Sequence, residues 1–163
     1  MEFLYVARPD SIIDGRLIYL VRGRLGEELA REAPADVDLV MGIPYSGTPS
    51  GEGFAREMGL PYRDGLIKNR YVTRTFINPT QEMRERGVRI KMNPMPYLLE
   101  GKRVVMTDDT IIRGTTTPIV AEMVRKARAR EIHMRVTSPP YIDEHGLGID
   151  SPFRAELIAN KMS

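Results

Sequence analysis

Apolar and polar positions along the chain predict alternating helices and strands. Residues 16–32 space apolar side chains three and four apart between charged ones, which is typical of an amphipathic helix. Its expected apolar face is Leu17, Leu20, Val21, Leu25 and Leu29. Short, nearly continuous apolar runs predict buried strands at 37–43 and 104–107, and further strands are expected at 66–67 and 132–136. Further helices are expected to end near Gly59, to span 116–129 and to begin at Ser151-Pro152.

The order of these elements predicts an α/β fold with a mainly parallel, twisted sheet flanked by helices. A length of 163 residues fits one domain, spanning 1–163. Two strands run into glycine-containing loops that lead into helices, at 44–48 and 108–116. Ligands of open α/β sheets bind beyond the carboxyl ends of the strands, so both loops are expected at the same edge.

Composition excludes several kinds of chemistry. The sequence contains no cysteine, which rules out disulfides, thiolate metal sites and a cysteine nucleophile among these residues. Of the two histidines, His133 lies in a strand pattern and is expected to be structural, and His145 receives no role. No apolar run is long enough for a membrane helix and no signal pattern opens the sequence, so a cytoplasmic protein is expected.

The charge distribution is more informative than the net charge of +2. Basic residues gather between positions 63 and 91, where only Asp64, Glu82 and Glu85 oppose them. The basic residues are Arg63, Lys68, Arg70, Arg74, Arg84, Arg86, Arg89 and Lys91. A local positive field of this kind suits a phosphorylated small molecule or nucleic acid.

The run 104–117 carries the most specific chemistry. An apolar strand leads into Asp108 and Asp109, and the loop that follows holds one arginine, one glycine and four threonines. Carboxylates can accept hydrogen bonds from ribose hydroxyls, and such a loop can present N–H groups and hydroxyls to a phosphate at a helix N-terminus. The residues alone leave a second interpretation open, a strand followed by an ordinary N-capped helix.

The run 104–116 resembles the phosphoribosyl diphosphate (PRPP) motif of the type I phosphoribosyltransferase family. Three further runs are similar to the flexible-loop signature of the glutamine PRPP amidotransferases: Gly65 to Val72, Arg74 to Ile77, and Pro79-Thr80-Gln81. Flanking segments agree, namely 7–11, Asn93-Pro94, 138–140 and 148–150. The resemblance covers almost the whole chain and implies the type I phosphoribosyltransferase fold.

This resemblance implies a pentosyltransferase that converts PRPP and ammonia to 5-phosphoribosylamine and pyrophosphate, the first step of purine biosynthesis. It implies Mg²⁺ as cofactor, purine nucleotides as inhibitors and a homo-oligomer, without a nucleic-acid or membrane partner. Family members carry an N-terminal glutaminase domain with a catalytic cysteine, whereas Met1 stands directly before the transferase half. We therefore expect an enzyme that uses free ammonia or a separate glutaminase. A non-catalytic PRPP- or nucleotide-binding domain, and a transferase for purine or pyrimidine bases, are the alternatives.

The resemblance also implies roles for individual residues. Asp108 and Asp109 would bind the ribose hydroxyls and the metal, and Ser46 and Gly47 would donate backbone N–H groups to pyrophosphate. Lys68 and Arg74 would neutralise the departing pyrophosphate. The 5′-phosphate would be held by Thr110, Ile111, Ile112, Arg113, Gly114, Thr115 and Thr116.

Two segments around the expected pyrophosphate end are unusual in different ways. Tyr45 stands where the family usually has an aspartate, which bears on pyrophosphate or metal binding. Residues 68–92 have little apolar pattern and are expected to be mobile without substrate and to close over PRPP. Arg70 and Tyr71 in this segment are candidates for ordering the closed loop, a role different from the one given to Lys68 and Arg74.

Overall fold

The computed structural model describes residues 2–69, 87–142 and 157–161. Its elements are η1 (Glu2–Val6), β1 (Ile12–Ile13), β2 (Arg16–Leu17), α1 (Ile18–Glu32), β3 (Leu39–Gly42), α2 (Thr48–Met58), β4 (Leu66–Lys68), β5 (Met92–Pro94), α4 (Pro96–Leu99), β6 (Arg103–Asp108), α5 (Thr116–Lys126), β7 (Glu131–Val136) and η3 (Ile158–Asn160). Residues 87–91 are also helical. The predicted elements up to residue 136 are confirmed with ends shifted by a few residues, while the helix expected from 151 begins outside the described residues. None of the described helices is long and apolar enough to cross a membrane.

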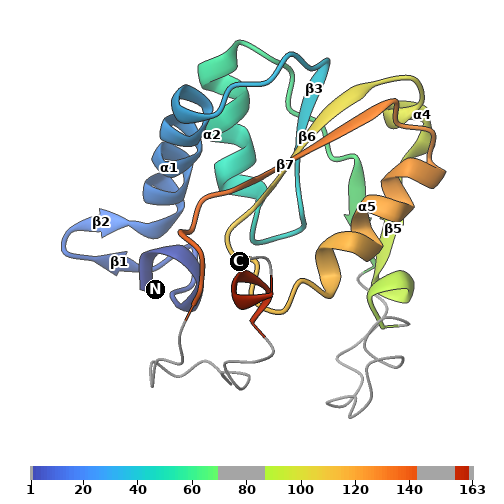
Figure 1. Cartoon of the computed structure of the whole chain (residues 1–163). Helices are drawn as coiled ribbons and strands as arrows, with labels where there is room; N and C mark the ends of the chain where they lie inside the picture. Colours follow the sequence, from blue (N-terminus) through green and yellow to red (C-terminus); the bar gives the residue numbers. More distant parts are fainter. Residues whose placement is uncertain (1, 70–86, 143–156, 162–163) are drawn as a thin grey trace.

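Three parallel strands form the central sheet in the order β3–β6–β7 (Figure 1). In the register of this sheet Val40 of β3 lies beside Val105 of β6, which lies beside His133 of β7. Tyr62 adds a single parallel bridge to Val40 on the other side of β3. The sheet confirms the predicted α/β architecture, and β3 is buried along its whole length, as its continuous apolar run indicated.

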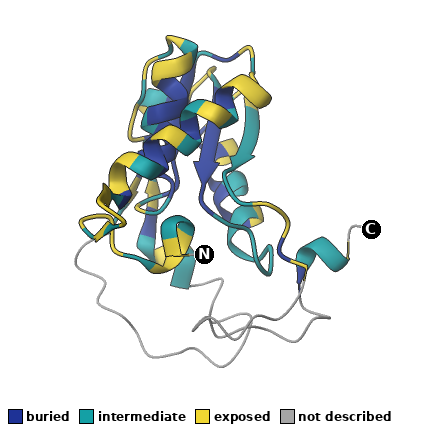
Figure 2. Cartoon of the chain, turned by 90° about the vertical axis from the view of Figure 1, so that its left-hand side faces the viewer, coloured by how far each residue is buried: buried dark blue, intermediate teal, exposed yellow. Residues whose placement is uncertain are grey.

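Helices cover both faces of this sheet, α1 and α2 on one side and α5 on the other (Figure 1). Successive residues of a strand point to opposite faces. Val40 and Val105 therefore belong to the core cluster that contains Phe54 of α2, whereas Met41 belongs to the cluster that contains Val124 of α5. Figure 2 shows buried positions in the centre of the fold, where β3 and β6 lie, and exposed positions on the outer helix surfaces.

Glycines bring α1 and α2 very close together. A Cβ on Gly26 would lie 1.9 Å from the backbone oxygen of Ser50, and a Cβ on Gly53 would lie 1.9 Å from the backbone oxygen of Gly23. The predicted apolar face of α1 is consequently wrong in part, because Leu20 is exposed and its leucine neighbours are only half-buried. The residues that α1 buries are Ile18, Arg22, Gly23, Gly26 and Ala30.

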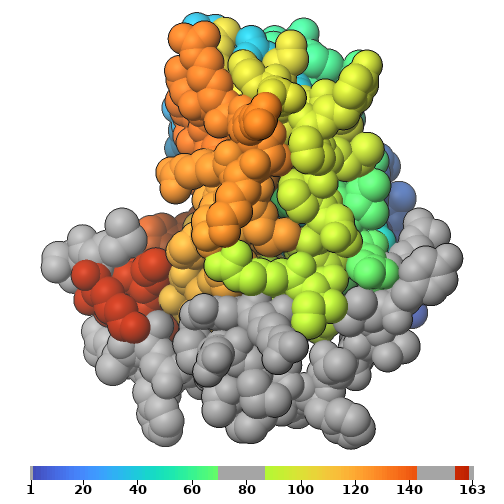
Figure 3. Space-filling model, turned by 90° about the vertical axis from the view of Figure 1, so that its right-hand side faces the viewer, coloured from blue at the N-terminus to red at the C-terminus, as the bar shows by residue number. Residues whose placement is uncertain are grey.

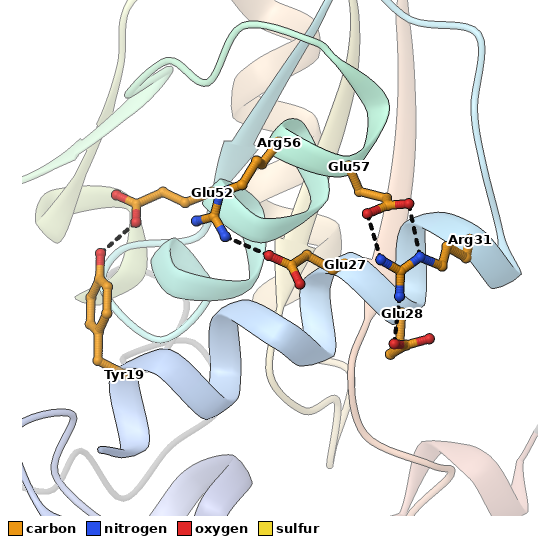
Figure 4. Close-up of polar contacts among 7 residues, drawn as sticks. All are labelled: Tyr19, Glu27, Glu28, Arg31, Glu52, Arg56 and Glu57. Atoms are coloured by element: carbon orange, nitrogen blue, oxygen red, sulfur yellow. Dashed lines mark hydrogen bonds and ion pairs between the residues drawn. The ribbon is translucent and has the colours of Figure 1, made fainter. Parts of the chain in front are cut away.

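Polar contacts border the junction of α1 and α2 (Figure 4). The contacts between the two helices are Arg31–Glu57, Arg56–Glu27 and Tyr19–Glu52. Each has a solvent-exposed partner, so its contribution to stability is small beside that of the close backbone packing.

A second sheet pairs β4 with β5 in antiparallel register, with Lys68 opposite Met92. Leu66 and Met92 belong to the core cluster of α5, and Arg89 forms an ion pair with Glu122 on that helix. Figure 3 shows α5 in orange beside the yellow-green segment that includes β5 and α4. The two-stranded sheet is therefore anchored on the α5 side of the molecule.

Candidate active site

Both predicted loops lie at the carboxyl end of the central sheet. Residues 43–47 connect β3 to α2, and residues 109–115 connect β6 to α5. Since β3 and β6 are adjacent parallel strands, the two turns emerge side by side, as expected from the topology. A pocket of about 520 Å³ opens there. It is lined by Tyr5, Ile43, Pro44, Ser46, Met92 and every residue from Asp108 to Thr117.

Contacts between Gly47 and Thr107 hold the two turns together. The Thr107 hydroxyl donates a hydrogen bond of 2.8 Å to the Gly47 carbonyl, and the Ile43 N–H donates one of 2.9 Å to the Thr107 carbonyl. A Cβ on Gly47 would lie 2.0 Å from the Thr107 carbonyl oxygen. Gly47 therefore lies behind the pocket wall, and Ser46 is the member of the predicted pair that lines the pocket.

Asp108 and Asp109 are two nearly buried carboxyl groups, with 9% and 5% of their surface exposed. The Ser46 hydroxyl donates a hydrogen bond of 2.8 Å to Oδ1 of Asp108, and the Asp109 N–H donates one of 2.9 Å to the same oxygen. Burial raises the pKa of Asp108 to about 6. Burial and then the charge of Asp108 raise the pKa of Asp109 to about 7.

Arg22 is a residue near this site that the sequence analysis missed. Its guanidinium is buried and donates hydrogen bonds of 2.9 Å to the carbonyl oxygens of Phe3 and Ala7. Burial lowers the pKa of Arg22, and the charge of Asp109 opposes that change. Arg22 thus fixes the N-terminal segment that brings Tyr5 to the pocket. The sequence offered one signal for this residue: Arg22 lies next to Gly23 and one helical turn before Gly26, on the side of the predicted helix that carries glycines.

The loop 109–115 has a left-handed position at Gly114, where φ is 69°. The positive φ is the main requirement for glycine, because a Cβ there would also meet Cδ1 of Ile158 at 2.1 Å but that flexible side chain end can shift. The Ile158 N–H donates a hydrogen bond of 3.0 Å to the carbonyl of Ile112. The segment that carries η3 therefore braces the outer side of this loop.

The remaining predicted residues divide into two groups. Lys68 is outside the pocket lining, with Nζ 5.2 Å from the ring centroid of Tyr45. His133 lies in β7, 3.3 Å from the Glu131 carboxylate and away from the pocket lining, and the structural role expected for it stays a prediction. Residues 70–86, which include Arg70, Tyr71 and Arg74, lie outside the described residues, as does His145. The predicted closure of 68–92 therefore stays a prediction.

The two aspartates offer the kind of ligand that Mg²⁺ prefers. No group of three or more His, Cys, Asp or Glu residues that can hold a metal ion occurs in the part of the chain that the structure describes. Mg²⁺ commonly takes only one or two carboxylates from a protein and completes its shell with water and substrate phosphates. Asp108 and Asp109 at the pocket wall fit that mode of binding.

Comparisons with known proteins agree with this geometry. A family model described as the phosphoribosyl transferase domain matches residues 10–138. The amidophosphoribosyltransferase of Synechococcus elongatus is 52% identical over 158 residues, which cover 97% of this chain and 32% of that protein. The amidophosphoribosyltransferase of Methanocaldococcus jannaschii is 53% identical over 159 residues, which cover 98% of this chain and 34% of that protein.

Solved structures give the same result. Glutamine phosphoribosylpyrophosphate amidotransferase from B. subtilis, complexed with ADP and GMP, matches with a TM-score of 0.86 and 48% identity, over 98% of this chain and 35% of that one. The structure of an allosteric regulatory enzyme of purine biosynthesis matches with a TM-score of 0.87 and 47% identity, over all of this chain and 35% of that one. The chain spans about a third of the length of these relatives. It belongs to the phosphoribosyl transferase domain family and has the type I phosphoribosyltransferase fold.

Proposed function

We propose that residues 1–163 act as one phosphoribosyltransferase domain that converts PRPP and ammonia to 5-phosphoribosylamine and pyrophosphate. Relatives named amidophosphoribosyltransferase, about half identical to this chain, support this reaction. The observation that carries the proposal is the single pocket wall formed by Ser46 and residues 108–117. This wall places paired carboxylates beside a loop at a helix N-terminus, as a sugar carrying phosphate groups requires.

In the proposed reaction the bond between ribose C1 and the pyrophosphate oxygen breaks. The ammonia nitrogen forms a bond to C1 and then loses a proton, and pyrophosphate leaves with the electron pair of the broken bond. Positive charge develops on the ribose ring while the bond to pyrophosphate breaks and before the bond to nitrogen is complete. Ionised Asp108 and Asp109 would bind the ribose hydroxyls and stabilise that charge from the pocket wall. The protein contributes mainly position and electrostatics.

The two phosphate-bearing ends of the substrate are assigned to opposite turns. The loop 110–116 would present N–H groups and hydroxyls to the 5′-phosphate at the start of α5, where the helix dipole favours an anion. Gly114 lets this loop take its left-handed conformation. The Ser46 turn would receive the pyrophosphate, with Lys68 near its outer side.

Mg²⁺ held by Asp108 and Asp109 would add positive charge beside the pyrophosphate. The complex of the B. subtilis relative with ADP and GMP supports binding of purine nucleotides to this chain, and their action as inhibitors stays a prediction. The 163 residues contain no cysteine to act on glutamine, so these residues by themselves would use ammonia from solution. The homo-oligomer and the cytoplasmic location stay predictions.

The test is release of pyrophosphate from PRPP by the purified chain, with ammonium or glutamine as the nitrogen source. We expect turnover with ammonium that increases with pH, because NH₃ rather than NH₄⁺ is the nucleophile. The Asp108→Asn/Asp109→Asn double variant, purified in the same way, controls for contaminating enzymes. Turnover with glutamine alone would contradict the proposal.

A non-catalytic PRPP-binding domain of the same fold is the second candidate, and Tyr45 is the observation that favours it. The pyrophosphate turn carries this tyrosine where the resemblance implies an aspartate. Mg²⁺-dependent binding of PRPP without turnover on ammonia, purine bases or pyrimidine bases would support the non-catalytic candidate. Turnover on a base but not on ammonia would instead identify a transferase with a different acceptor.

A further inference from the structure

Tyr45 and Lys68 form a contact between the three-stranded sheet and the sheet of β4 and β5. The Lys68 Nζ lies 5.2 Å from the centroid of the Tyr45 ring, within the range of about 6 Å for a cation–π interaction. Tyr45 belongs to the turn that follows β3 of the three-stranded sheet, whereas Lys68 ends β4 of the two-stranded sheet. The contact is thus a long-range one that depends on how the two sheets pack.

The contact lies at the rim of the pocket. Pro44 and Ser46, the two neighbours of Tyr45 in the chain, both line the pocket. Met92, which lies opposite Lys68 in the β4–β5 register, also lines it. Each partner is therefore adjacent to a lining residue, and Tyr45 is adjacent to Ser46, on the pyrophosphate side of the proposed site.

The Tyr45 ring is uncharged, so it does not neutralise the positive charge of Lys68. None of the ion pairs found among the described residues includes Lys68. An aromatic ring orients an ammonium group through its quadrupole, whereas a carboxylate at the same place would pair with the ammonium and offset its attraction for an anion. A lysine side chain also loses rotamer freedom when it is held in place, so prior ordering lowers the entropy cost of binding.

We infer that Tyr45 is a positioning residue, whose ring holds the Lys68 ammonium at the pocket rim to receive the pyrophosphate group of the substrate. The inference rests on the proposed function, because that proposal assigns pyrophosphate to the Ser46 turn. It gives the tyrosine a role in place of the carboxylate that the resemblance implies at this position.

The first test is a double-mutant cycle read as PRPP affinity by calorimetry in the presence of Mg²⁺. Tyr45→Leu is expected to weaken PRPP binding about two- to fivefold, the range of an exposed cation–π contact. Tyr45→Phe keeps the ring and should restore most of the affinity. Lys68→Met should also weaken binding, and adding Tyr45→Leu to Lys68→Met should cause no further loss.

Additive losses in the double variant would overturn the inference, because Tyr45 would then act independently of Lys68. A loss of affinity in Tyr45→Phe equal to that in Tyr45→Leu would also overturn it, since the ring would not matter. Tyr97→Leu is the matched control, because Tyr97 lies on α4 with 96% of its surface exposed and is expected to bind PRPP like the unmodified chain.

The second test needs no ligand. Reductive dimethylation with ¹³C keeps the positive charge of lysine and gives each lysine an NMR signal. The aromatic ring should displace the Lys68 signal from its position in Tyr45→Leu, and Tyr45→Phe should retain the displacement. Identical Lys68 signals in the unmodified chain and Tyr45→Leu would overturn the inference.

Failure of the inference is distinguishable from failure of the proposed reaction. If the chain binds PRPP but releases no pyrophosphate with ammonium, the reaction is wrong and the affinity cycle still decides the role of Tyr45. A chain without measurable affinity for PRPP would overturn both. Turnover with additive losses in the cycle would overturn the inference alone.

Discussion

The Ser46 hydroxyl donates a hydrogen bond of 2.8 Å to Oδ1 of Asp108, from a position 62 residues earlier in the chain. The bond connects the turn after β3 to the last residue of β6. It favours the ionised form of Asp108 and so opposes the burial that raises the pKa of this carboxyl group to about 6. The Ser46 side chain is therefore linked directly to the carboxylate pair, in addition to the backbone role expected from the sequence.

Ser46→Ala is expected to raise the pKa of Asp108 further, because the ionised carboxylate loses a hydrogen-bond donor. PRPP binding with Mg²⁺ should then be lost at a higher pH as the solution is acidified, with a midpoint about one unit above that of the unmodified chain. Calorimetric titrations between about pH 5 and 9 measure this midpoint. Ser46→Thr keeps a hydroxyl and is the control, and equal midpoints for the alanine variant and the unmodified chain would contradict the prediction.

Asp109→Asn is expected to abolish turnover and to stabilise the free protein above neutral pH. The folded-state pKa of Asp109, about 7, exceeds the ordinary value of 3.8, so the folded state retains a proton that the unfolded state has released. The free energy of unfolding of the unmodified chain therefore falls as the pH rises from about 4 to about 7. Removing the carboxylate should raise that free energy by about 1–3 kcal/mol at alkaline pH.

Urea unfolding of Asp109→Asn at about pH 5 and pH 8 checks this sign. The gain in stability should be present at the higher pH and should shrink at the lower one. Asp14→Asn is the matched control, because Asp14 is exposed in the turn between β1 and β2. A gain that is the same at both pH values would show that relief of a buried charge is not its cause.

Arg22→Gln tests the link between the N-terminal segment and the carboxylate pair. The variant loses charged hydrogen bonds to Phe3 and Ala7 and is expected to destabilise the fold by about 2 kcal/mol. The pKa of Asp109 should rise, because Arg22 lowers it in the unmodified chain. Hydrogen exchange should become faster in residues 2–7. Arg24→Gln, an exposed change on the same helix, should leave these amides unaffected.

Gly26→Ala tests the close packing of α1 on α2. The new Cβ would lie 1.9 Å from the Ser50 carbonyl oxygen, a backbone atom that can move only if the helices separate. We expect a loss of about 3 kcal/mol, measured by urea unfolding. Gly59→Ala is the comparison, because a Cβ there meets open space at φ 65° and should cost about 1–2 kcal/mol of backbone strain. Equal losses in both variants would contradict the packing argument.

Strands β3 and β6 could be predicted from sequence because they are buried along nearly their whole length. Runs such as Leu39–Gly42 contain no polar residue, so an apolar run marks each of these two strands. The buried face of α1 could not be predicted in the same way. Helical periodicity counts large apolar side chains, whereas α1 packs through Gly23 and Gly26, where the absence of a side chain is what brings the neighbouring backbone close.

The candidate site could likewise be predicted only in part from the sequence. The edge of the sheet and the two loops could be predicted, because residues 104–117 and 39–47 each combine a strand with the turn that follows it. Contacts between segments that are distant in the sequence could not be predicted. The bond from Ser46 to Asp108 depends on the register of β3 against β6, and the contact of Lys68 with Tyr45 depends on the packing of two separate sheets.

The contacts of Gly47 with Thr107 have a consequence for selectivity. They hold the turn after β3 against β6, and β6 in turn leads directly into the loop 109–115. In the proposed site, the two turns that would bind the anionic groups are therefore held at a fixed distance from each other. A pentose that carries anionic groups at both ends would contact both turns, whereas a sugar with one phosphate would contact only one of them. The chain would in this way select its substrate by length before any chemistry begins.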